Sequence, residues 1–500
     1  MGKRILALVL MSAALLLTAC QANPTQNAVT RKDHQAFLNR AQQTGTTPSE
    51  GAAEQVSYHD QFTSTDGSIT FNLNIDQELL HKTAPVVEVV PHFLSGEEVR
   101  QIARAVLPDA SFYEYEPDAE VPFSKSALQK KITLWSPYAT EEGLKELEGP
   151  YYSESDPEEN NHRIDVIQRT LSAWSASLPT APAENPHTPC QWTFKKESAY
   201  QLDETGTLEI RADAETSGWE YGLVATSRDQ RDYRLNAISI QVGGHRYNSY
   251  ISDQEAIYAQ LLQTCKPTQQ QLDAVRDKAQ TILDRLNALG MDQWQIAEVS
   301  PEVQGTGPRA WYSIAVDVVP VFNGVPALNG QLSSRTLDEG TYAPVYYRTL
   351  ICLSFSLDGA LLYFGMDSPL TVKQTLNDNV LTMTTDELLE KALNQLKLSD
   401  IGNGYGLPSA KMISDYETYK KEKLTCTIDL TSIHYDLSLG RIKAPGDDDT
   451  YYYVPFFTLN GTVNYYGADS GNLVMSSADI DGPDQPLICL NAIDGTVVSF

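Results

Sequence analysis

The stretch LICLSFSLDGALLYF at residues 350–364 has a near copy, LICLNAIDGTVVSF, at residues 487–500. Each copy reaches an Asp-Gly pair, Asp358-Gly359 or Asp494-Gly495, just before its last apolar residues. Asp-Gly favours a tight turn between two antiparallel strands. Each copy therefore predicts the closing hairpin of a sheet, and the two together predict that one structural unit occurs twice.

A capped amphipathic helix precedes the strands of each copy. Thr268 with Gln271, and Thr384 with Glu387, have the spacing of a capping box at a helix start. Apolar residues follow both boxes at helical intervals. A helix on one sheet buries a single face of each element, so doubling the unit lets apolar faces share a core. We expect an α+β fold in which antiparallel sheets are each packed by one or two helices, with a duplicated helix-plus-sheet unit at residues 267–383 and 384–500.

The sequence before the repeat predicts further elements. Ile69, Phe71, Leu73 and Ile75 alternate with polar residues, which is typical of a half-buried strand. A capping box at Ser95 and Glu98 predicts a helix, and PTAPAENPHTP interrupts the pattern with four prolines. We expect an N-terminal α+β domain at residues 67–178, a proline-rich linker at 179–189 and a β-rich segment at 190–266.

The N-terminus has the three parts of a bacterial lipoprotein signal. MGKR is basic, ILALVLMSAALLL is apolar but too short to span a bilayer, and LTAC ends at Cys20. A buried helix that ends in Cys would have to match all three features by chance. We predict a signal peptide at residues 1–19, lipid attachment at Cys20 on the outer face of the cell membrane, and a flexible tether at residues 20–66.

The net charge limits the possible partners of this chain, and its compartment decides how its cysteines are interpreted. The net charge of −28 repels nucleic acid, which we exclude as a partner. Outside the cytoplasm disulfides are allowed. Cys190 and Cys265 flank one predicted sheet segment, and we consider a bridge between them. Cys352 and Cys489 occupy equivalent places in the two copies and predict buried thiols.

Signatures of catalysis and of cofactor or metal binding are missing from the sequence. It has no G-x-S-x-G, S-x-x-K with K-T-G, H-E-x-x-H or phosphate-binding glycine pattern. We therefore name no catalytic, cofactor-binding or metal-ligating residue, and expect no cofactor. The acidic runs at 447–449 and 479–484 favour solvated turns over calcium sites. The aromatic clusters at 346–347, 451–453, 456–457 and 465–466 predict either cross-strand pairs or a surface for peptide or glycan.

Taken in order, several motifs resemble a known group of proteins. These are the lipobox, PVVEVVPHFLSGEEV, YYRTLICLSFSLDGALLYFGMDSPL, YYYVPFFTLNG and the terminal LNAIDGTVV. Over residues 66–500 they resemble uncharacterised lipoproteins of Gram-positive gut bacteria, a domain of unknown function. The ending also looks like PepSY modules and extracellular regulators of the YycH/YycI type. That resemblance implies a binding or inhibitory module and supplies no catalytic residue.

We expect a lipid-anchored, non-enzymatic lipoprotein that binds or regulates a partner in the cell envelope. The expected partners are the bilayer, through acylated Cys20, and an envelope protein, peptide or glycan. The alternative is a secreted hydrolase acting on envelope or dietary glycan or peptide, with carboxylates brought together by folding. A solute-binding protein is a third option, and it would show two α/β lobes.

Overall fold

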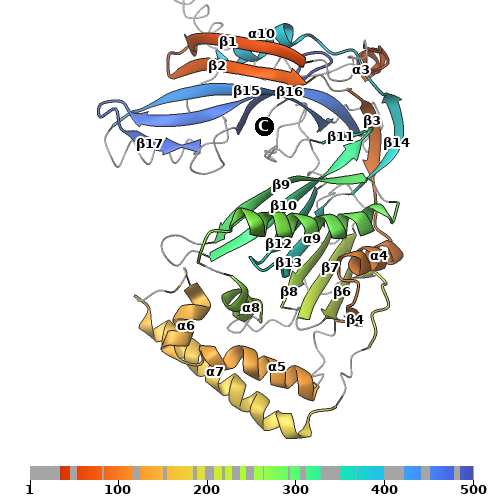
Figure 1. The fold of residues 1–500 in the computed structure, drawn as a ribbon, viewed down its shortest axis with the longest axis vertical. Coiled ribbons are helices and arrows are strands. Elements are labelled where there is room, and N and C mark those ends of the chain that lie inside the picture. The colour runs from red at the N-terminus through yellow and green to blue at the C-terminus, as the bar shows by residue number, and fades with distance from the viewer. Residues whose placement is uncertain are drawn as a thin grey trace, which may run out of the picture. The chain divides into compact units, whose positions relative to one another are not determined.

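The computed structural model divides the chain into two compact units (Figure 1). Unit 1 comprises residues 1–90, 322–345 and 372–500, and unit 2 comprises residues 91–321 and 346–371. The structure describes residues 34–45, 53–80, 84–115, 124–149, 152, 155–183, 188–196, 208–216, 220–227, 237–243, 253–262, 264–290, 293–304, 311–327, 350–367, 369–398, 422–440, 451–477 and 485–498.

Unit 1 is built on a nine-stranded sheet with the central order β1-β2-β15-β16-β18-β19. β17 and β3 also pair with β16, and β14 pairs with β3. The β2–β15 pair is parallel and joins the two ends of the chain. The strands are β1 (Ala53–Thr63), β2 (Ile69–Leu80), β3 (Val86–Pro91), β14 (Leu370–Asn377), β15 (Leu424–Gly440), β16 (Tyr451–Gly467), β17 (Leu473–Ser476), β18 (Gln485–Asn491) and β19 (Val497–Val498).

Two helices cover this sheet from opposite faces. α10 (Thr385–Leu396) begins at the predicted capping box and buries Leu388, Leu389, Ala392 and Leu396 against β1, β2, β15, β16 and β18. On the other face α3 (His34–Ala41) places Phe37 and Ala41 against Tyr452, Val454 and Phe456 of β16. β16 is therefore apolar on both faces because both of its faces are covered.

Unit 2 is built on a sheet with the strand order β10-β12-β13-β8-β7-β6-β4, to which β9 and β5 add beside β10 and β6. α4 (Gly96–Val106) and α9 (Gln269–Asn287) pack their apolar stripes on it. The strands are β4 (Ser111–Glu114), β5 (Lys195–Lys196), β6 (Leu208–Glu215), β7 (Glu220–Ser227), β8 (Ala237–Val242), β9 (Gln293–Gln304), β10 (Trp311–Phe322), β12 (Leu350–Phe355) and β13 (Leu361–Asp367). The two-residue strand β11 (Val325–Pro326) belongs to unit 1.

A smaller helical cluster completes unit 2. α5 (Lys125–Trp135), α6 (Glu141–Glu148), α7 (Pro157–Ser177) and α8 (Asp253–Leu261) enclose a second apolar core. Trp135, Leu144 and Ile167 are fully buried in it. Short 3-10 turns follow α5 and α7 at Ser136–Tyr138 and Leu178–Thr180.

The two predicted copies share one topology. α9 is followed by a meander in which β9, β10, β12 and β13 pair in turn, and α10 by a meander of β15, β16, β18 and β19. Gly359 and Gly495 adopt φ +81° and +69° in the two closing turns. The first copy is longer by one residue before this turn, and its closing strand β13 also carries a β-bulge at Leu362, opposite Ser354/Phe355. The predicted α+β class and the duplicated unit are confirmed, but the expectation that the two copies share a core was wrong. α9 packs in the core of unit 2 and α10 in a separate core of unit 1, because each helix covers the sheet of its own copy.

The boundaries of the units differ from the expected contiguous segments. The predicted domain at 67–178 is divided at Val90, because β2 pairs with β15 as well as with β1 and so belongs to the sheet of unit 1. The segment at 190–266 contains α8 as well as strands. In the expected linker at 179–189, which falls within unit 2, the Pro182 carbonyl accepts from the Lys125 N–H, and Pro189 forms an antiparallel β-bridge with Tyr113.

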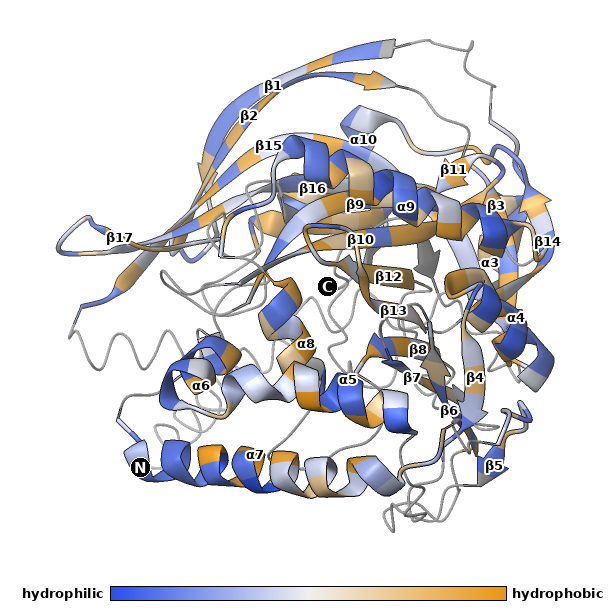
Figure 2. Cartoon of the chain, turned by 60° about the horizontal axis from the view of Figure 1, so that its bottom comes forward, coloured by the Kyte–Doolittle hydropathy of each residue, from blue (hydrophilic) through white to orange (hydrophobic). Residues whose placement is uncertain are grey.

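The expected tether at residues 20–66 also needs correction, since part of it is folded. β1 pairs with β2 along its full length, and α3 packs on the sheet through Phe37, whose ring centroid lies 5.2 Å from that of Tyr452. β1 folds onto the sheet because Val56, Tyr58 and Phe62 pack on its apolar core. The overall polar composition of residues 20–66 led to the prediction of a tether although these apolar residues occur within it. Figure 2 shows this alternation of polar and apolar residues along β1 and β2.

Candidate functional site

One face of the β1-β2-β15-β16 sheet is polar where the opposite face is apolar. Strand alternation puts every second residue on this face, and directly paired residues share it. We call it the polar face. It presents Gln55, Ser57, His59, Gln61, Thr63, Thr70, Asn72, Asn74, Asp76, Glu78, Thr425, Thr427, Asp429, Ser432, His434, Thr462, Asn464 and Tyr466. Amide and hydroxyl groups predominate, and Lys and Arg do not occur in β1 or β2.

A continuous line of hydrogen bonds crosses five strands on the polar face. Gln61 Nε2 donates to Asn72 Oδ1 at 2.8 Å, and Asn72 Nδ2 donates to Asp429 Oδ1 at 2.7 Å. From the other side Asn464 Nδ2 donates to Asp429 Oδ2 at 3.1 Å, and Asn464 Oδ1 accepts from Ser476 Oγ at 2.7 Å. We call these five residues the polar row.

The polar row fixes the orientation of its side chains. Asp429 accepts one amide donor on each carboxylate oxygen, so both neighbouring amides have a defined direction. Hydrogen bonds to a charged group are also stronger than those between neutral groups. The four side chains of the row that are not buried, Gln61, Asn72, Asp429 and Asn464, are therefore already oriented in the free protein.

A second group on the polar face lies closer to the β1 edge. Ser57 Oγ donates to Asp76 Oδ1 at 2.7 Å, and His59 Nε2 lies 3.2 Å from the same oxygen. The hydrogen bond from Ser57 is the main reason that the pKa of Asp76 lies below its usual value, and His59 lowers it further. This carboxylate is solvent-exposed and ionised at neutral pH.

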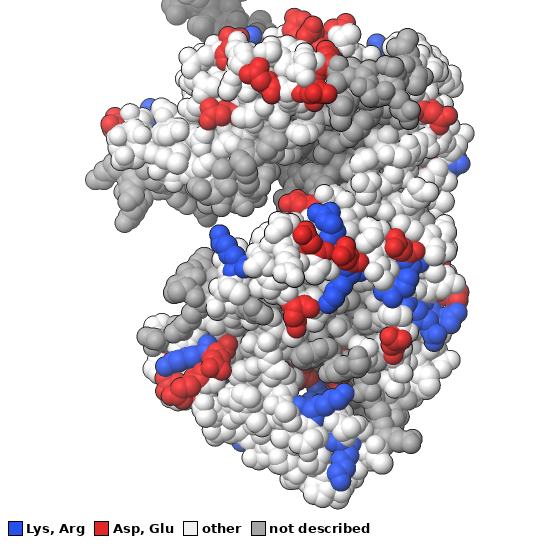
Figure 3. All heavy atoms as spheres, viewed as in Figure 1, with Lys and Arg blue, Asp and Glu red and all other residues white. Residues whose placement is uncertain are grey.

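Acidic groups also gather on the opposite side of β1, at the start of α10. Tyr58 Oη donates to Asp386 Oδ1 at 2.6 Å, and burial together with this bond raises the pKa of Tyr58. Thr385 Oγ1 donates to Glu54 Oε2 at 3.2 Å. Figure 3 shows mainly acidic side chains over β1, β2 and α10 in that view. Both faces beside β1 are thus electronegative.

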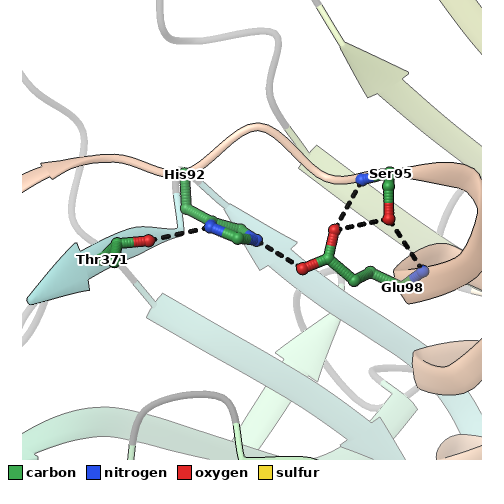
Figure 4. Close-up of polar contacts among 4 residues, drawn as sticks. All are labelled: His92, Ser95, Glu98 and Thr371. Carbon is green, nitrogen blue, oxygen red and sulfur yellow. Dashed lines mark hydrogen bonds and ion pairs between the residues drawn. The ribbon is translucent and has the colours of Figure 1, made fainter.

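A second candidate site is a hydroxyl–imidazole–carboxylate chain in unit 2 (Figure 4). His92 Nδ1 lies 2.8 Å from Thr371 Oγ1, and His92 Nε2 lies 2.8 Å from Glu98 Oε1. An ionised carboxylate only accepts, so Nε2 carries a proton. In the neutral imidazole Nδ1 then accepts from the Thr371 hydroxyl. This is the connectivity of a nucleophile, its base and an orienting acid.

Glu98 has a structural task in the same cluster. Its Oε2 accepts from Ser95 N–H at 2.7 Å and from Ser95 Oγ at 2.6 Å, which forms the capping box of α4. Burial alone would raise the pKa of Glu98, but the bonds from Ser95 and His92 outweigh it and lower the pKa. Ser95 donates to Glu98 and not to His92, so it serves as a helix cap.

A third group is a buried ion pair in unit 2. Lys131 of α5 pairs with Asp253 of α8, and its Nζ lies 3.6 Å from Glu220 Oε2 of β7. Trp135 Nε1 donates to Asp253 Oδ1 at 2.7 Å. Lys131 and Asp253 are only 5% and 7% exposed. Glu220 is partly exposed, so the buried part of this group is the pair of Lys131 with Asp253, which joins α5 to α8 and offers little access to a ligand.

The predicted special residues lie in different places. Cys20, both acidic runs and Tyr346-Tyr347 fall outside the described residues. Cys190 and Cys265 are thiols, one buried and one exposed, so the bridge considered between them is not formed. Cys489 is buried as predicted, but Cys352 is only half-buried, with Sγ 3.7 Å from Asp317 Oδ1. Among the described residues no three His, Cys, Asp or Glu side chains are placed to hold a metal.

The aromatic clusters of β16 are almost wholly internal. Tyr451 to Tyr453, Phe456, Phe457 and Tyr465 are buried, and Tyr466 is half-buried. The expectation that about half of each cluster faces away from a core was wrong, because both faces of β16 are covered. The polar row replaces them as the candidate surface. Its only signal in the sequence was the polar half of each alternating strand.

The fold and site define an α+β protein with two helix-on-sheet repeats and a polar sheet face. The chain matches no protein-family model and no curated protein sequence. Among solved structures it is similar to the Bacillus megaterium YpeB C-terminal domain, with 11% identity, 57% of this chain and 86% of that chain covered, and a TM-score of 0.22. Within the described residues no helix is long and apolar enough to cross a membrane.

Proposed function

We propose that this protein is a lipoprotein anchored by lipid to the outer face of the cell membrane, and that it binds a partner in the cell envelope without transforming it. Acylated Cys20 supplies the anchor, and the nine-stranded sheet supplies the binding surface. The resemblance to PepSY modules and YycH/YycI-type regulators agrees with such a role. The partner is an envelope protein, peptide or glycan.

The polar row is the observation that carries this proposal. Surface side chains normally lose rotational freedom when they bind a partner. Gln61, Asn72, Asp429, Asn464 and Ser476 already hold one another across five strands. A partner that bonds to them therefore incurs less of this entropic cost.

Detergent phase partition tests the anchor. The full chain, expressed in a Gram-positive host, is expected in the detergent phase, and the Cys20→Ala variant in the aqueous phase, because acylation adds favourable membrane transfer free energy. Equal partition of the two proteins would refute lipid attachment at Cys20.

Crosslinking in living cells tests the binding surface. We expect one enriched envelope partner with the full chain and its loss in Asn74→Arg, which places a long charged side chain on the polar face. Asn74 and Asn472 are both exposed residues of unit 1, so Asn472→Arg is the matched control. Equal recovery of the crosslinked partner with both variants would show that the partner does not bind to this face.

A hydrolase is the second candidate, and the Thr371–His92–Glu98 chain favours it. The test is digestion of cell-wall fragments and of an unfolded protein substrate by the purified full chain. Cleavage that is lost in both Thr371→Val and His92→Gln would establish this activity. A His92→Gln chain as active as the parent would exclude this cluster as its source.

A further inference from the structure

We propose that the outer edge of β1 binds an extended polypeptide segment rich in Lys or Arg, which adds to the nine-stranded sheet as a further strand. This inference rests on the proposed binding function and names the place and chemistry of the contact. Addition of a strand to a sheet edge is a general mode of peptide recognition, in which main-chain hydrogen bonds supply affinity.

The edge of β1 is open over part of its length. Its eleven residues pair with β2 without a register shift, and no described strand lies on its other side. The backbone N–H of Gln61 donates to the side chain of Asp60 at 2.8 Å, which shows that this N–H points away from β2, toward the open edge. Backbone N–H and C=O groups alternate in direction along a strand, so those of Gln55, Ser57 and His59 also point toward the open edge.

Other strand edges carry features that prevent pairing, as is usual in natural sheets. β9 has Pro301 within it, β14 has the exposed Lys373, and β4, β5, β17 and β19 have four residues or fewer. β1 contains no Pro, Lys or Arg. Among the described strands, β1 is therefore the long edge strand that carries none of these features.

The charge around this edge selects a basic partner. An added strand directs alternate side chains to the two faces of the sheet. On the polar face Asp76 and Glu78 lie one strand away, on β2, behind Ser57 and Gln55, and on the other face Glu54 and Asp60 lie on β1 itself. Lys or Arg side chains on the added strand complement both faces, whereas acidic side chains are repelled.

A second copy of this chain fits the edge less well. The register that pairs Gln55, Ser57 and His59 of two antiparallel β1 strands also sets Glu54 of each copy opposite Asp60 of the other. Like charges directly opposite destabilise a strand pair. This argument favours a different, basic polypeptide over self-association.

Peptide titration tests the proposal. The probe is a labelled peptide of about ten residues in which Thr and Lys alternate, long enough to span the open part of β1. Its binding to the full chain in non-ionic detergent is followed by fluorescence anisotropy. We expect it to bind at least about tenfold more tightly than a peptide with the same residues in two blocks, and than an alternating Thr-Glu peptide.

Two substitutions at one position give the matched control. Ser57→Pro removes an outward N–H and leaves the β2 ladder intact, because proline is tolerated at an edge whose N–H faces solvent. Ser57→Ala removes the side chain alone. We expect a loss of at least about tenfold in affinity for Ser57→Pro and little change for Ser57→Ala. Equal binding by the two variants, or by the alternating and block peptides, would overturn the proposal.

Crosslinking separates this proposal from the broader function. A cellular partner that is captured equally by Ser57→Pro and by the parent chain leaves the binding function intact and overturns the edge proposal. A partner lost in Ser57→Pro but kept in Ser57→Ala supports both. Dimers of the parent chain in light scattering that vanish in Ser57→Pro would assign the edge to a second copy and refute the basic partner.

Discussion

Asn72 Nδ2 lies 2.7 Å from Asp429 Oδ1, and this hydrogen bond joins residues 357 positions apart in the chain. It spans the parallel pair of β2 and β15, the point at which the N-terminal part of the chain enters the sheet of the second repeat. The polar row, and with it the proposed binding face, depends on this contact. The first two predictions concern the region around Asp429.

Replacement of Asp429 by Ala is expected to destabilise unit 1 by about 2 kcal/mol, because two amide donors lose their acceptor at once. Hydrogen exchange of β2 and β15 peptides would measure the change in the unit itself. Asp429→Asn keeps one acceptor oxygen and should cost less. Exchange rates of Asp429→Ala equal to those of the parent would contradict the role of the row.

Gly461→Ala should destabilise the same region by about 3 kcal/mol. A Cβ at this position would lie 2.1 Å from the Asp429 carbonyl oxygen, and backbone atoms cannot move aside as a side chain does. Gly471→Ala is the control, since its Cβ would meet nothing within 4 Å and only its φ of +68° opposes the change. Hydrogen exchange of β15 and β16 should distinguish the two variants.

Lys131→Met is expected to destabilise unit 2 by about 3–5 kcal/mol, because it leaves the buried Asp253 carboxylate without its cation. Tryptophan fluorescence during urea unfolding reports on unit 2 specifically, since all six tryptophans lie there. Lys145→Met, which removes a helix-surface pair with Glu141, should change stability by less than about 0.5 kcal/mol. Recovery of stability in the double variant Lys131→Met/Asp253→Leu would show that the unpaired carboxylate causes the loss.

The capping carboxylate of α4 predicts a pH dependence. The folded-state pKa of Glu98 is lowered, so its ionised form stabilises unit 2 at neutral pH, and this contribution is lost as the pH falls through that pKa. Glu98→Gln should therefore cost about 1 kcal/mol at pH 7. The difference in stability between Glu98→Gln and the parent chain should vanish below the pH range in which carboxyl groups usually titrate, about pH 4. Glu298→Gln, at an exposed position of β9 and away from any helix cap, is the control and should change the stability at pH 7 by less than about 0.5 kcal/mol.

Thiol reactivity tests the cysteine assignments. Cys265 is exposed and should react with iodoacetamide under native conditions. Burial raises the pKa of Cys190 to about 11 and that of Cys426 to about 12, so both should react only after unfolding. Labelling of Cys190 and Cys265 that requires a reducing agent would instead establish a disulfide between them.

The local features of this chain were accessible from its sequence. Capping boxes at Ser95, Thr268 and Thr384 start helices in the structure, as their short-range spacing predicts. The Asp-Gly turns and the helix-then-meander order also follow from neighbouring residues. Each of these depends on contacts between residues close in sequence, which a linear pattern records directly.

Only the tertiary structure decided the grouping of these elements. The parallel pairing of β2 with β15, the burial of β16 on both faces and the pair of Lys131 with Asp253 all join residues far apart in the chain. Alternation in a strand specifies two faces but does not specify the neighbour or what covers each face. The sequence by itself determined the repeated helix-and-strand units, and long-range packing determined which polar residues meet on the surface where we propose that a partner binds.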